Sequence, residues 1–197
     1  LTQYPAEEVI PLLRKGLTAD HHEVRRVVLK QLDDIPRPLI PLYEKSLKDS
    51  SFRNIELALR QLVEHQPRNL GTYLTTTKGI KGLDNHNVRL TWLELAAAYK
   101  SQSYTEQLVP YASGNYEFRT RVKAMKALKK LNHCSKVVIQ HLADAYLNPN
   151  GRLSRPARKV LKYFYQQQQY QVMIEQYYQT NTWPDFAEEK WQELLEA

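Results

Sequence analysis

The sequence predicts an all-α fold built from repeated pairs of antiparallel helices, and three observations support this prediction. The 197 residues contain only six glycines and no alternating runs of Val, Ile and Thr, which disfavours a sheet. Leu, Ala, Lys, Gln and Glu, which favour helices, are abundant. Apolar residues recur at spacings of three and four, and a short motif recurs about every thirty residues. We therefore expect a single domain of five to six helix pairs over residues 1–197.

The repeated motif is an apolar residue followed by arginine, and it marks the start of the second helix of each pair. It occurs at residues 24–25, 52–53, 88–89 and 118–119, and more weakly as Ser-Arg at 154–155. Apolar residues at helical spacing follow it, and we expect them to be buried. The clearest sets are Val24, Val27, Val28 and Leu32; Phe52, Ile55, Leu59 and Leu62; and Val88, Trp92, Leu95 and Tyr99.

The first helix of each pair carries a different apolar motif, which in three repeats contains a proline. It spans residues 9–13, 39–43 and 108–111, with Pro11, Pro41 and Pro110 inside it. Proline is tolerated in the first turn of a helix and kinks the helix at deeper positions. We therefore expect these first helices to start late or to bend.

The residues before the second helices resemble helix caps. Asp20, Asp84 and Asn150 each stand four residues before the first member of a motif, and all three have side chains that cap helix N-termini well. Glu23 follows Asp20 by three residues, which is the spacing of a capping box. The sequence thus predicts a capped helix start at Asp20.

The histidines and the cysteine do not form a metal-binding pattern. His21 and His22 are adjacent, so on a helix they point about 100° apart, whereas a shared metal ion needs a spacing of three or four residues. Cys134 and His141 are seven apart on an expected first helix, about 10 Å along its axis. We expect no metal site in this chain and interpret Cys134 as a core residue.

The motif resembles the HEAT and armadillo class of helical repeats, in which a turn Asp precedes a Val-Arg pair. Asp20 with Val24 and Arg25, and Asp84 with Val88 and Arg89, carry the likeness. The resemblance implies a right-handed α-solenoid in which Asp and Arg side chains pair along the stack. The repeat-stacking residues that it implies are Asp20, Arg25, Arg53, Asp84 and Arg89.

The net charge of +7 is concentrated in one third of the chain. Residues 100–165 hold 13 basic and 3 acidic groups, whereas residues 166–197 hold 1 and 6. We expect an acidic capping helix at about residues 184–197. On the helix from residue 118 to 131, four cations fall within about 60° of one another, and the next repeat could extend this basic stripe. The stripe comprises Arg119, Lys123, Lys126, Lys130, Arg158 and Lys159.

Two interpretations of the basic stripe stay open from the residues alone. It is either an ordinary solvated helix face or a surface for an acidic protein, a peptide carboxylate or a nucleic-acid backbone. Nucleic acid is the weakest of these, because the sequence lacks the aromatic platforms of single-strand binders and any recognition-helix motif.

The sequence contains no catalytic motif that we recognise. It has no His-Glu-x-x-His, no glycine-rich phosphate loop and no Gly-x-Ser-x-Gly. No apolar run approaches the ~18 residues of a membrane span. A single cysteine requires no oxidising compartment, so we favour a cytoplasmic location. Because the chain begins at Leu1 rather than Met, we expect it to be part of a longer protein.

A second resemblance concerns the middle of the chain. Residues 81–112, with Asn87, Arg89, Trp92, Leu93 and Pro110, are similar to the C-terminal helical domain of zinc aminopeptidases of the aminopeptidase N and leukotriene hydrolase group. Residues 150–164 resemble that family's Gly-Arg-x-x-x-x-Arg-Pro segment, one residue shorter here.

The aminopeptidase resemblance implies a non-catalytic domain that packs on an upstream catalytic domain and limits the access of peptides to its zinc site. It also implies that Arg152, with Arg155 beside it, binds the terminal carboxylate of a peptide substrate. The alternatives are a free-standing HEAT-like scaffold for an acidic protein partner and, third, a basic surface for nucleic acid.

Overall fold

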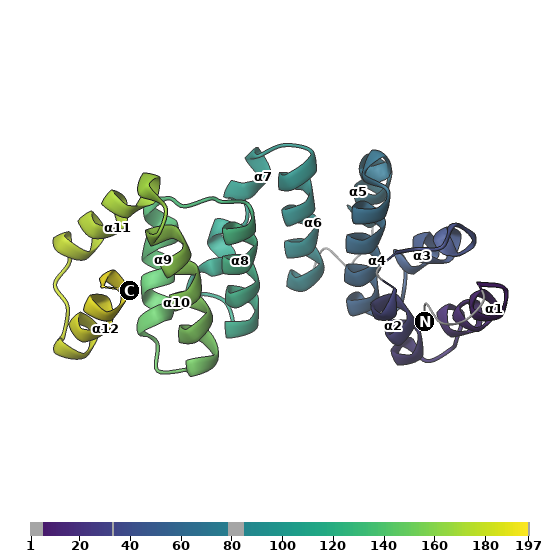
Figure 1. Cartoon of the computed structure of the whole chain (residues 1–197), viewed down its shortest axis with the longest axis horizontal. Coiled ribbons are helices and arrows are strands. Elements are labelled where there is room, and N and C mark those ends of the chain that lie inside the picture. The colour runs from purple at the N-terminus through teal and green to yellow at the C-terminus, as the bar shows by residue number, and fades with distance from the viewer. Residues whose placement is uncertain (1–5, 33, 79–84, 197) are drawn as a thin grey trace. The chain divides into compact units, whose positions relative to one another are not determined.

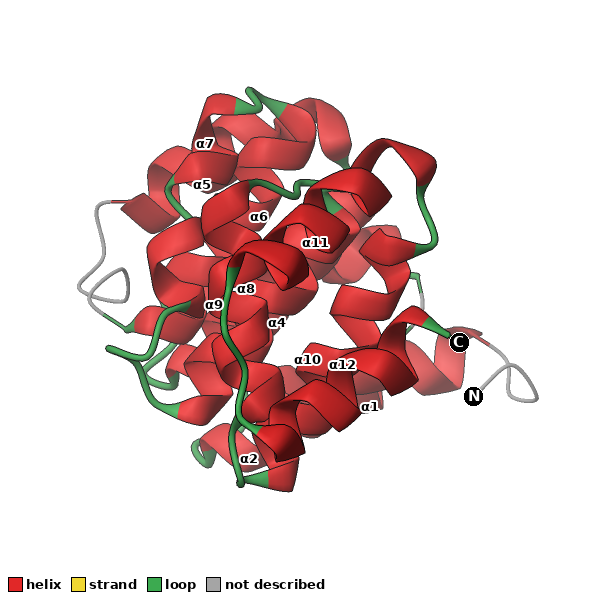
Figure 2. Cartoon of the chain, turned by 90° about the vertical axis from the view of Figure 1, so that its left-hand side faces the viewer, coloured by secondary structure: helices red, strands yellow, loops and turns green. Residues whose placement is uncertain are grey.

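The computed structural model describes residues 6–32, 34–78 and 85–196. All regular structure within these ranges is helical, which confirms the predicted all-α class (Figures 1 and 2). The chain divides into two compact units, Leu1–Ser101 and Gln102–Ala197. Among the described residues, no helix is long and apolar enough to cross a membrane.

The first unit contains six α-helices and two short 3-10 turns within its described residues. Short loops connect most of them, as Figure 1 shows. In chain order they are α1 (Ala6–Leu17), α2 (His22–Gln31), η1 (Arg37–Leu39), α3 (Ile40–Ser46), α4 (Phe52–His65), η2 (Pro67–Asn69), α5 (Leu70–Lys78) and α6 (His86–Tyr99).

The helices of this unit pack in pairs. Helix α4 contacts α2 and α6 along one row, while α3 and α5 pack on α4 from the other row. Helix α1 packs on α2 so closely that a Cβ atom at Gly16 would lie 2.5 Å from Cγ2 of Val28. Glycine therefore permits this helix crossing, at a cost in helix propensity of about 1 kcal/mol.

The predicted core of this unit is correct in α4 and α6 and partly wrong in α2. Val24 and Val27 are 46% and 57% exposed, whereas Leu29 is fully buried. The reason is that α2 packs on α1 and α4 through the side that carries Arg25, Val28 and Leu29. Phe52 and Tyr99, at the two ends of their predicted faces, are also exposed. The fully buried large side chains of the unit include Leu29, Leu39, Tyr43, Ile55, Leu59, Leu62, Leu90 and Leu93.

The second unit begins with two short helical segments and continues with five longer helices. Its elements are α7 (Ser103–Glu106), η4 (Val109–Ala112), α8 (Phe118–Lys130), α9 (Lys136–Leu147), α10 (Gly151–Tyr165), α11 (Gln168–Thr180) and α12 (Asp185–Leu195). Helix α10 packs on α8 and α12 along one row, and α9 packs on η4 and α11 along the other. The acidic helix expected near residues 184–197 is therefore α12, beside α10.

Aromatic rings hold α12 in the second unit. Trp191 is fully buried and lies 5.4 Å from Trp183 and 6.3 Å from Tyr146, measured between ring centroids. Tyr177 and Tyr178 of α11 contact the same indole. Burial of such rings contributes several kcal/mol per side chain, about 3–5 for a Trp truncated to Ala.

The structure agrees with only some of the predictions for the prolines and the helix caps. Pro41 and Pro110 occupy the first turns of α3 and η4, as expected, whereas Pro11 lies inside α1. Asn150 caps α10, as predicted, through a bond from the backbone N–H of Arg152 to its Oδ1 at 3.0 Å. The capping box predicted at Asp20 is wrong: α2 begins at His22, so its N-cap position is occupied by His21, one residue after Asp20.

Candidate functional site

The N-terminus of α10 brings the two arginines of the predicted carboxylate site together. Arg152 and Arg155 are exposed in its first turns and line an open hollow of about 630 Å³ with Asn150, Gly151 and Pro156. Among the described residues, no carboxylate forms an ion pair with either guanidinium. The helix dipole adds a partial positive charge at this end. The hollow can therefore attract a carboxylate or phosphate.

Pro156 changes the hydrogen bonding of the same turn. Proline has no backbone N–H, so the carbonyl of Arg152, four residues earlier, lacks its usual helical donor. The two guanidinium groups are thus the donors that the first turns of α10 offer to a ligand. They suit a carboxylate, such as the C-terminus of a peptide, or a phosphate.

The basic stripe of α8 points away from the core, as the sequence predicts. Arg119, Lys126 and Lys130 are exposed, and Lys123 is half-buried. The helix starts at Glu117, which accepts bonds from the backbone N–H groups of Arg119 and Thr120 at 2.8 and 2.9 Å. Burial raises the pKa of Glu117, but these bonds outweigh it and the pKa is lowered. Glu117 is thus ionised and serves as the cap of α8.

The two stripe residues on α10, Arg158 and Lys159, have different surroundings. Arg158 lies on the side of α12 and pairs with Glu193 at 3.2 Å. Lys159 is exposed beyond it, and Lys190 of α12 lies over the Tyr146 ring at 5.7 Å. The acidic helix α12 therefore neutralises one end of the basic surface.

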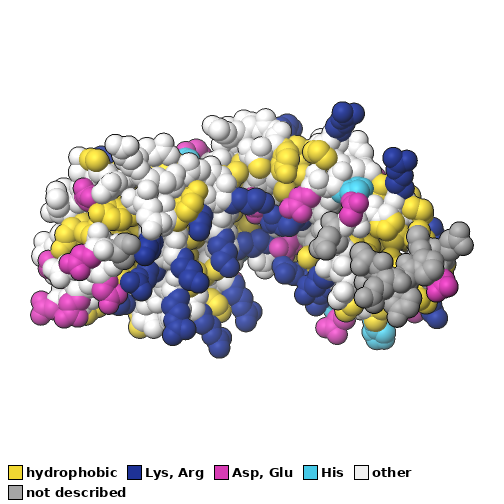
Figure 3. Space-filling view, viewed as in Figure 1, with side chains coloured by type: hydrophobic (Ala, Val, Ile, Leu, Met, Phe, Trp, Pro, Cys, Tyr) yellow, Lys and Arg dark blue, Asp and Glu magenta, His cyan; other side chains and the backbone are white. Residues whose placement is uncertain are grey.

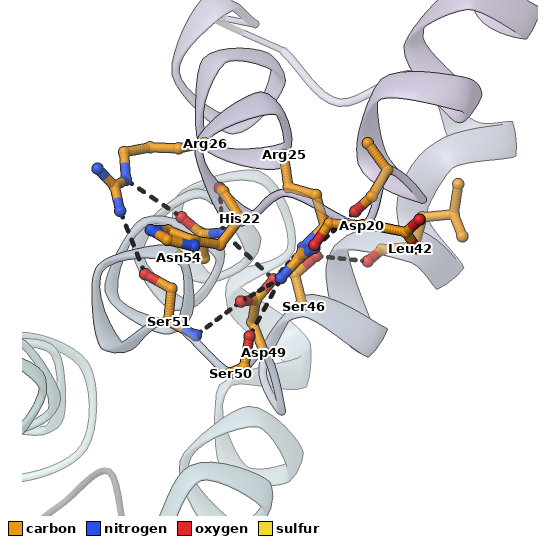
Figure 4. Close-up of polar contacts among 11 residues, drawn as sticks. Asp20, His22, Arg25, Arg26, Leu42, Ser46, Asp49, Ser50, Ser51 and Asn54 are labelled. Atoms are coloured by element: carbon orange, nitrogen blue, oxygen red, sulfur yellow. Dashed lines mark hydrogen bonds and ion pairs between the residues drawn. The ribbon is translucent and has the colours of Figure 1, made fainter.

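Arg25 connects the turns of two successive helix pairs in the first unit (Figure 4). Its Nε and Nη2 atoms donate to the Asp49 carboxylate at 2.6 and 2.9 Å, and its Nη1 donates to the carbonyls of Ala19 and Asp20. Asp49 also accepts bonds from the Ser51 backbone N–H and from Asn54. Arg25 thus bonds to the backbone of Asp20 and to the side chain of Asp49.

The other residues of the predicted stacking set have different partners. Arg53 pairs with Glu56 of its own helix at 2.8 Å, so it forms no bridge to the next pair. Arg89 is exposed on α6, and Asp84 lies outside the described residues. The link between α4 and α6 comes instead from Arg60, whose two Nη atoms donate to Glu94 at 2.9 and 2.8 Å.

Sequence reasoning also missed Arg121, the most buried cation of the second unit. Its Nη2 donates to Asp144 at 2.6 Å and its Nε to the Ala112 carbonyl at 3.1 Å, and the residue is 4% exposed. The available signal was its position on α8: at 100° per residue it lies opposite the stripe that begins at Arg119. This arginine therefore joins η4, α8 and α9.

The histidines and Cys134 do not converge on a metal. Among residues 6–32, 34–78 and 85–196, no three His, Cys, Asp or Glu side chains are placed to hold an ion. Cys134 precedes α9 rather than lying on it, because Ser135 caps that helix. Burial raises the pKa of the Cys134 thiol to about 12, so the reactive thiolate is scarce at neutral pH.

A second hollow, in the first unit, lies beside the Arg25–Asp49 pair. It measures about 820 Å³ and is lined by the turns after α1 and α3 and by Tyr73, Thr72 and Thr76 of α5. Its charges nearly balance, because Asp20 and Glu44 face Lys45 and Lys48. This hollow offers no excess of either charge to select a ligand.

Comparisons with known proteins add no relative to this picture. No protein family, curated protein or solved structure with which the chain was compared matches it.

Proposed function

We propose that the chain is a non-catalytic helical-repeat domain of a zinc aminopeptidase, in which the N-terminus of α10 receives the terminal carboxylate of a peptide. The observation that carries this proposal is the exposed pair Arg152 and Arg155 at the Asn150-capped start of α10, open to a hollow of about 630 Å³. A guanidinium fork matches the two oxygens of a carboxylate.

The proposed repeat architecture is a HEAT-like right-handed α-solenoid. It is supported by the rows within each unit: α2, α4 and α6 pack in sequence in the first, and α8, α10 and α12 in the second. The Arg25–Asp49 and Arg60–Glu94 pairs each connect successive helix pairs. Such arrays expose a continuous surface to a partner domain or a substrate.

The described residues do not fit a zinc site, because no group of three ligand side chains converges. The proposal therefore assigns the zinc and the chemistry to a separate catalytic domain upstream, and it assigns to this chain the packing and the peptide access. A His-Glu-x-x-His motif encoded upstream of Leu1, followed by a Glu about twenty residues later, is the expected sequence signature. A complete upstream sequence without this motif would refute the aminopeptidase assignment.

The carboxylate site is tested with two forms of one short peptide, with a free and with an amidated C-terminus. We expect the free form to bind the chain more tightly, and Arg152→Ala to weaken its binding about tenfold, the equivalent of one charged hydrogen bond. Arg37→Ala, at an exposed arginine of the first unit, serves as the control. Equal binding of both peptide forms, or an equal loss in the two variants, would exclude the site.

A further inference from the structure

Two neighbouring helices of the second unit carry only positive charge. Helix α8 contains six Lys and Arg residues and α10 contains five, and neither helix contains Asp or Glu. The two helices pack directly against each other. Figure 3 shows Lys and Arg side chains gathered over this part of the unit. Like charges on adjacent helix surfaces repel, so this arrangement costs stability in the absence of a counter-charge.

A single contact sets the register of the two helices. Nζ of Lys129 lies 4.5 Å from the centre of the Tyr163 ring, so position 129 of α8 lies beside position 163 of α10. Both helices run in the same direction (Figure 1). Lys126 stands three residues before Lys129 and Lys159 stands four residues before Tyr163, so both lysines lie about one turn earlier and at a similar height along the two helices. Both of these lysines are exposed. Arg119 lies two turns before Lys126 on the same stripe, about 10 Å along the axis.

These three cations, Arg119, Lys126 and Lys159, define what we call the basic face. The chain satisfies other cations of α8 and α10 itself, since Arg121 pairs with Asp144 and Arg158 pairs with Glu193. Glu117 lies next to Arg119 and interacts with its charge, whereas among the described residues neither Lys126 nor Lys159 forms an ion pair with a carboxylate. These two lysines are therefore open to a counter-charge from another molecule.

Two features of the structure favour a protein segment over nucleic acid as that counter-charge. The rings nearest to the basic face are covered by the chain's own cations: Arg119 lies over Phe118 at 5.4 Å and Lys129 over Tyr163. They are thus not free to stack with bases, which single-strand binding requires. In addition, the acidic helix α12 packs on α10 and pairs with it through Glu193. Helix α10 thus already pairs with a carboxylate-bearing helix, through Arg158, which is not part of the basic face.

We propose that the basic face binds an acidic helical segment of a partner protein, laid over α8 and α10 where the two helices pack together. Glutamates seven residues apart on that segment match the spacing of Arg119 and Lys126, and a third carboxylate reaches Lys159 on α10. The proposal concerns different side chains from the carboxylate site at Arg152 and stands without it.

The test uses a fluorescently labelled, helix-forming peptide with glutamates at every third or fourth residue, and the same peptide with glutamine in their place. Binding to the full chain is measured by anisotropy at low and physiological salt. We expect the double variant Lys126→Glu, Lys159→Glu to bind the glutamate peptide at least about tenfold more weakly. Each exposed ion pair raises the affinity by up to about fivefold, and reversal of the charge turns attraction into repulsion.

The matched control is Lys15→Glu, Lys136→Glu, which changes the net charge equally at exposed lysines of α1 and α9. Circular dichroism establishes that both variants keep their helices. Equal weakening in the two variants, or equal binding of the glutamine peptide, would overturn the proposal. A single-stranded oligonucleotide or a phosphatidylserine vesicle that binds through Lys126 and Lys159 more tightly than the glutamate peptide would also overturn it.

Discussion

Replacing Asp49 with asparagine tests whether one buried carboxylate holds the first helix pairs together. The carboxylate accepts two bonds from Arg25 at 2.6 and 2.9 Å, one from the Ser51 N–H at 2.8 Å and one from Asn54 at 3.2 Å. Asparagine retains one oxygen and turns an NH₂ group toward these donors. The Arg25 guanidinium, 15% exposed, then loses its counter-charge. We expect Asp49→Asn to lower the free energy of unfolding of the first unit by about 3 kcal/mol.

The measurement is urea unfolding followed by far-ultraviolet circular dichroism. Arg53→Ala is the control, since it breaks the ion pair with Glu56 within one helix, and the Arg53 side chain is 51% exposed. Exposed pairs of this kind contribute about 0.5 kcal/mol or less to the free energy of unfolding. A cost for Asp49→Asn no larger than that of Arg53→Ala would refute the assigned role of Asp49.

The stabilising effect of Asp49 should also depend on pH. Burial raises the pKa of Asp49, but the bonds from Arg25, Ser51 and Asn54 outweigh it and hold the pKa below its ordinary value of 3.8. A group with a lowered pKa in the folded state stabilises fully above its ordinary pKa and loses this contribution as the pH falls through the folded-state value. The difference between wild type and Asp49→Asn should therefore shrink below pH 3.8.

Two further variants address the second unit. Burial and the Arg121 charge lower the pKa of His141, against the opposing effect of Asp144, so the folded unit favours neutral histidine and loses stability as the pH falls through about 6.5 and below. His141→Gln should remove this loss. If the melting temperature fell equally in the wild type and in His141→Gln as the pH was lowered, this prediction would be contradicted. Tyr146→Phe removes a bond from the tyrosine hydroxyl to the Lys190 carbonyl at 2.6 Å. We expect the free energy of unfolding to fall by about 1 kcal/mol. We also expect backbone amides of α12 to exchange faster in the variant than in the wild type, and those of α8 to be affected less. Unchanged exchange in α12 would show that this bond does not hold the helix.

The sequence predicted features that depend on local spacing and missed those that depend on a neighbour. The motif at Phe118 and Arg119 located the start of α8, and Asn150 was correctly identified as a cap, because both signals lie within one turn of the helix. The exposure of Val24 could not be predicted, since it depends on which side of α2 meets α1 and α4.

The same distinction applies to the candidate site. Arg152 and Arg155 were predicted as a site from the aminopeptidase resemblance, and the structure places both in the first turns of α10 beside one hollow. The structural arginine of the second unit was missed because the burial of Arg121 depends on Asp144, 23 residues later, and on the Ala112 carbonyl. Arg158 belonged to the predicted basic stripe, but its partner Glu193 lies on a helix that only the fold brings beside it.

The aromatic cluster around α12 has a spectroscopic consequence. Two of the three tryptophans of the chain, Trp183 and Trp191, stand 5.4 Å apart in it, whereas Trp92 belongs to the first unit and donates its indole N–H to the Leu74 carbonyl. Near-ultraviolet dichroism depends on rigid packing of such rings. The optical spectrum of the second unit therefore reports on α12, and release of that helix by a competing ligand would be visible without any attached label.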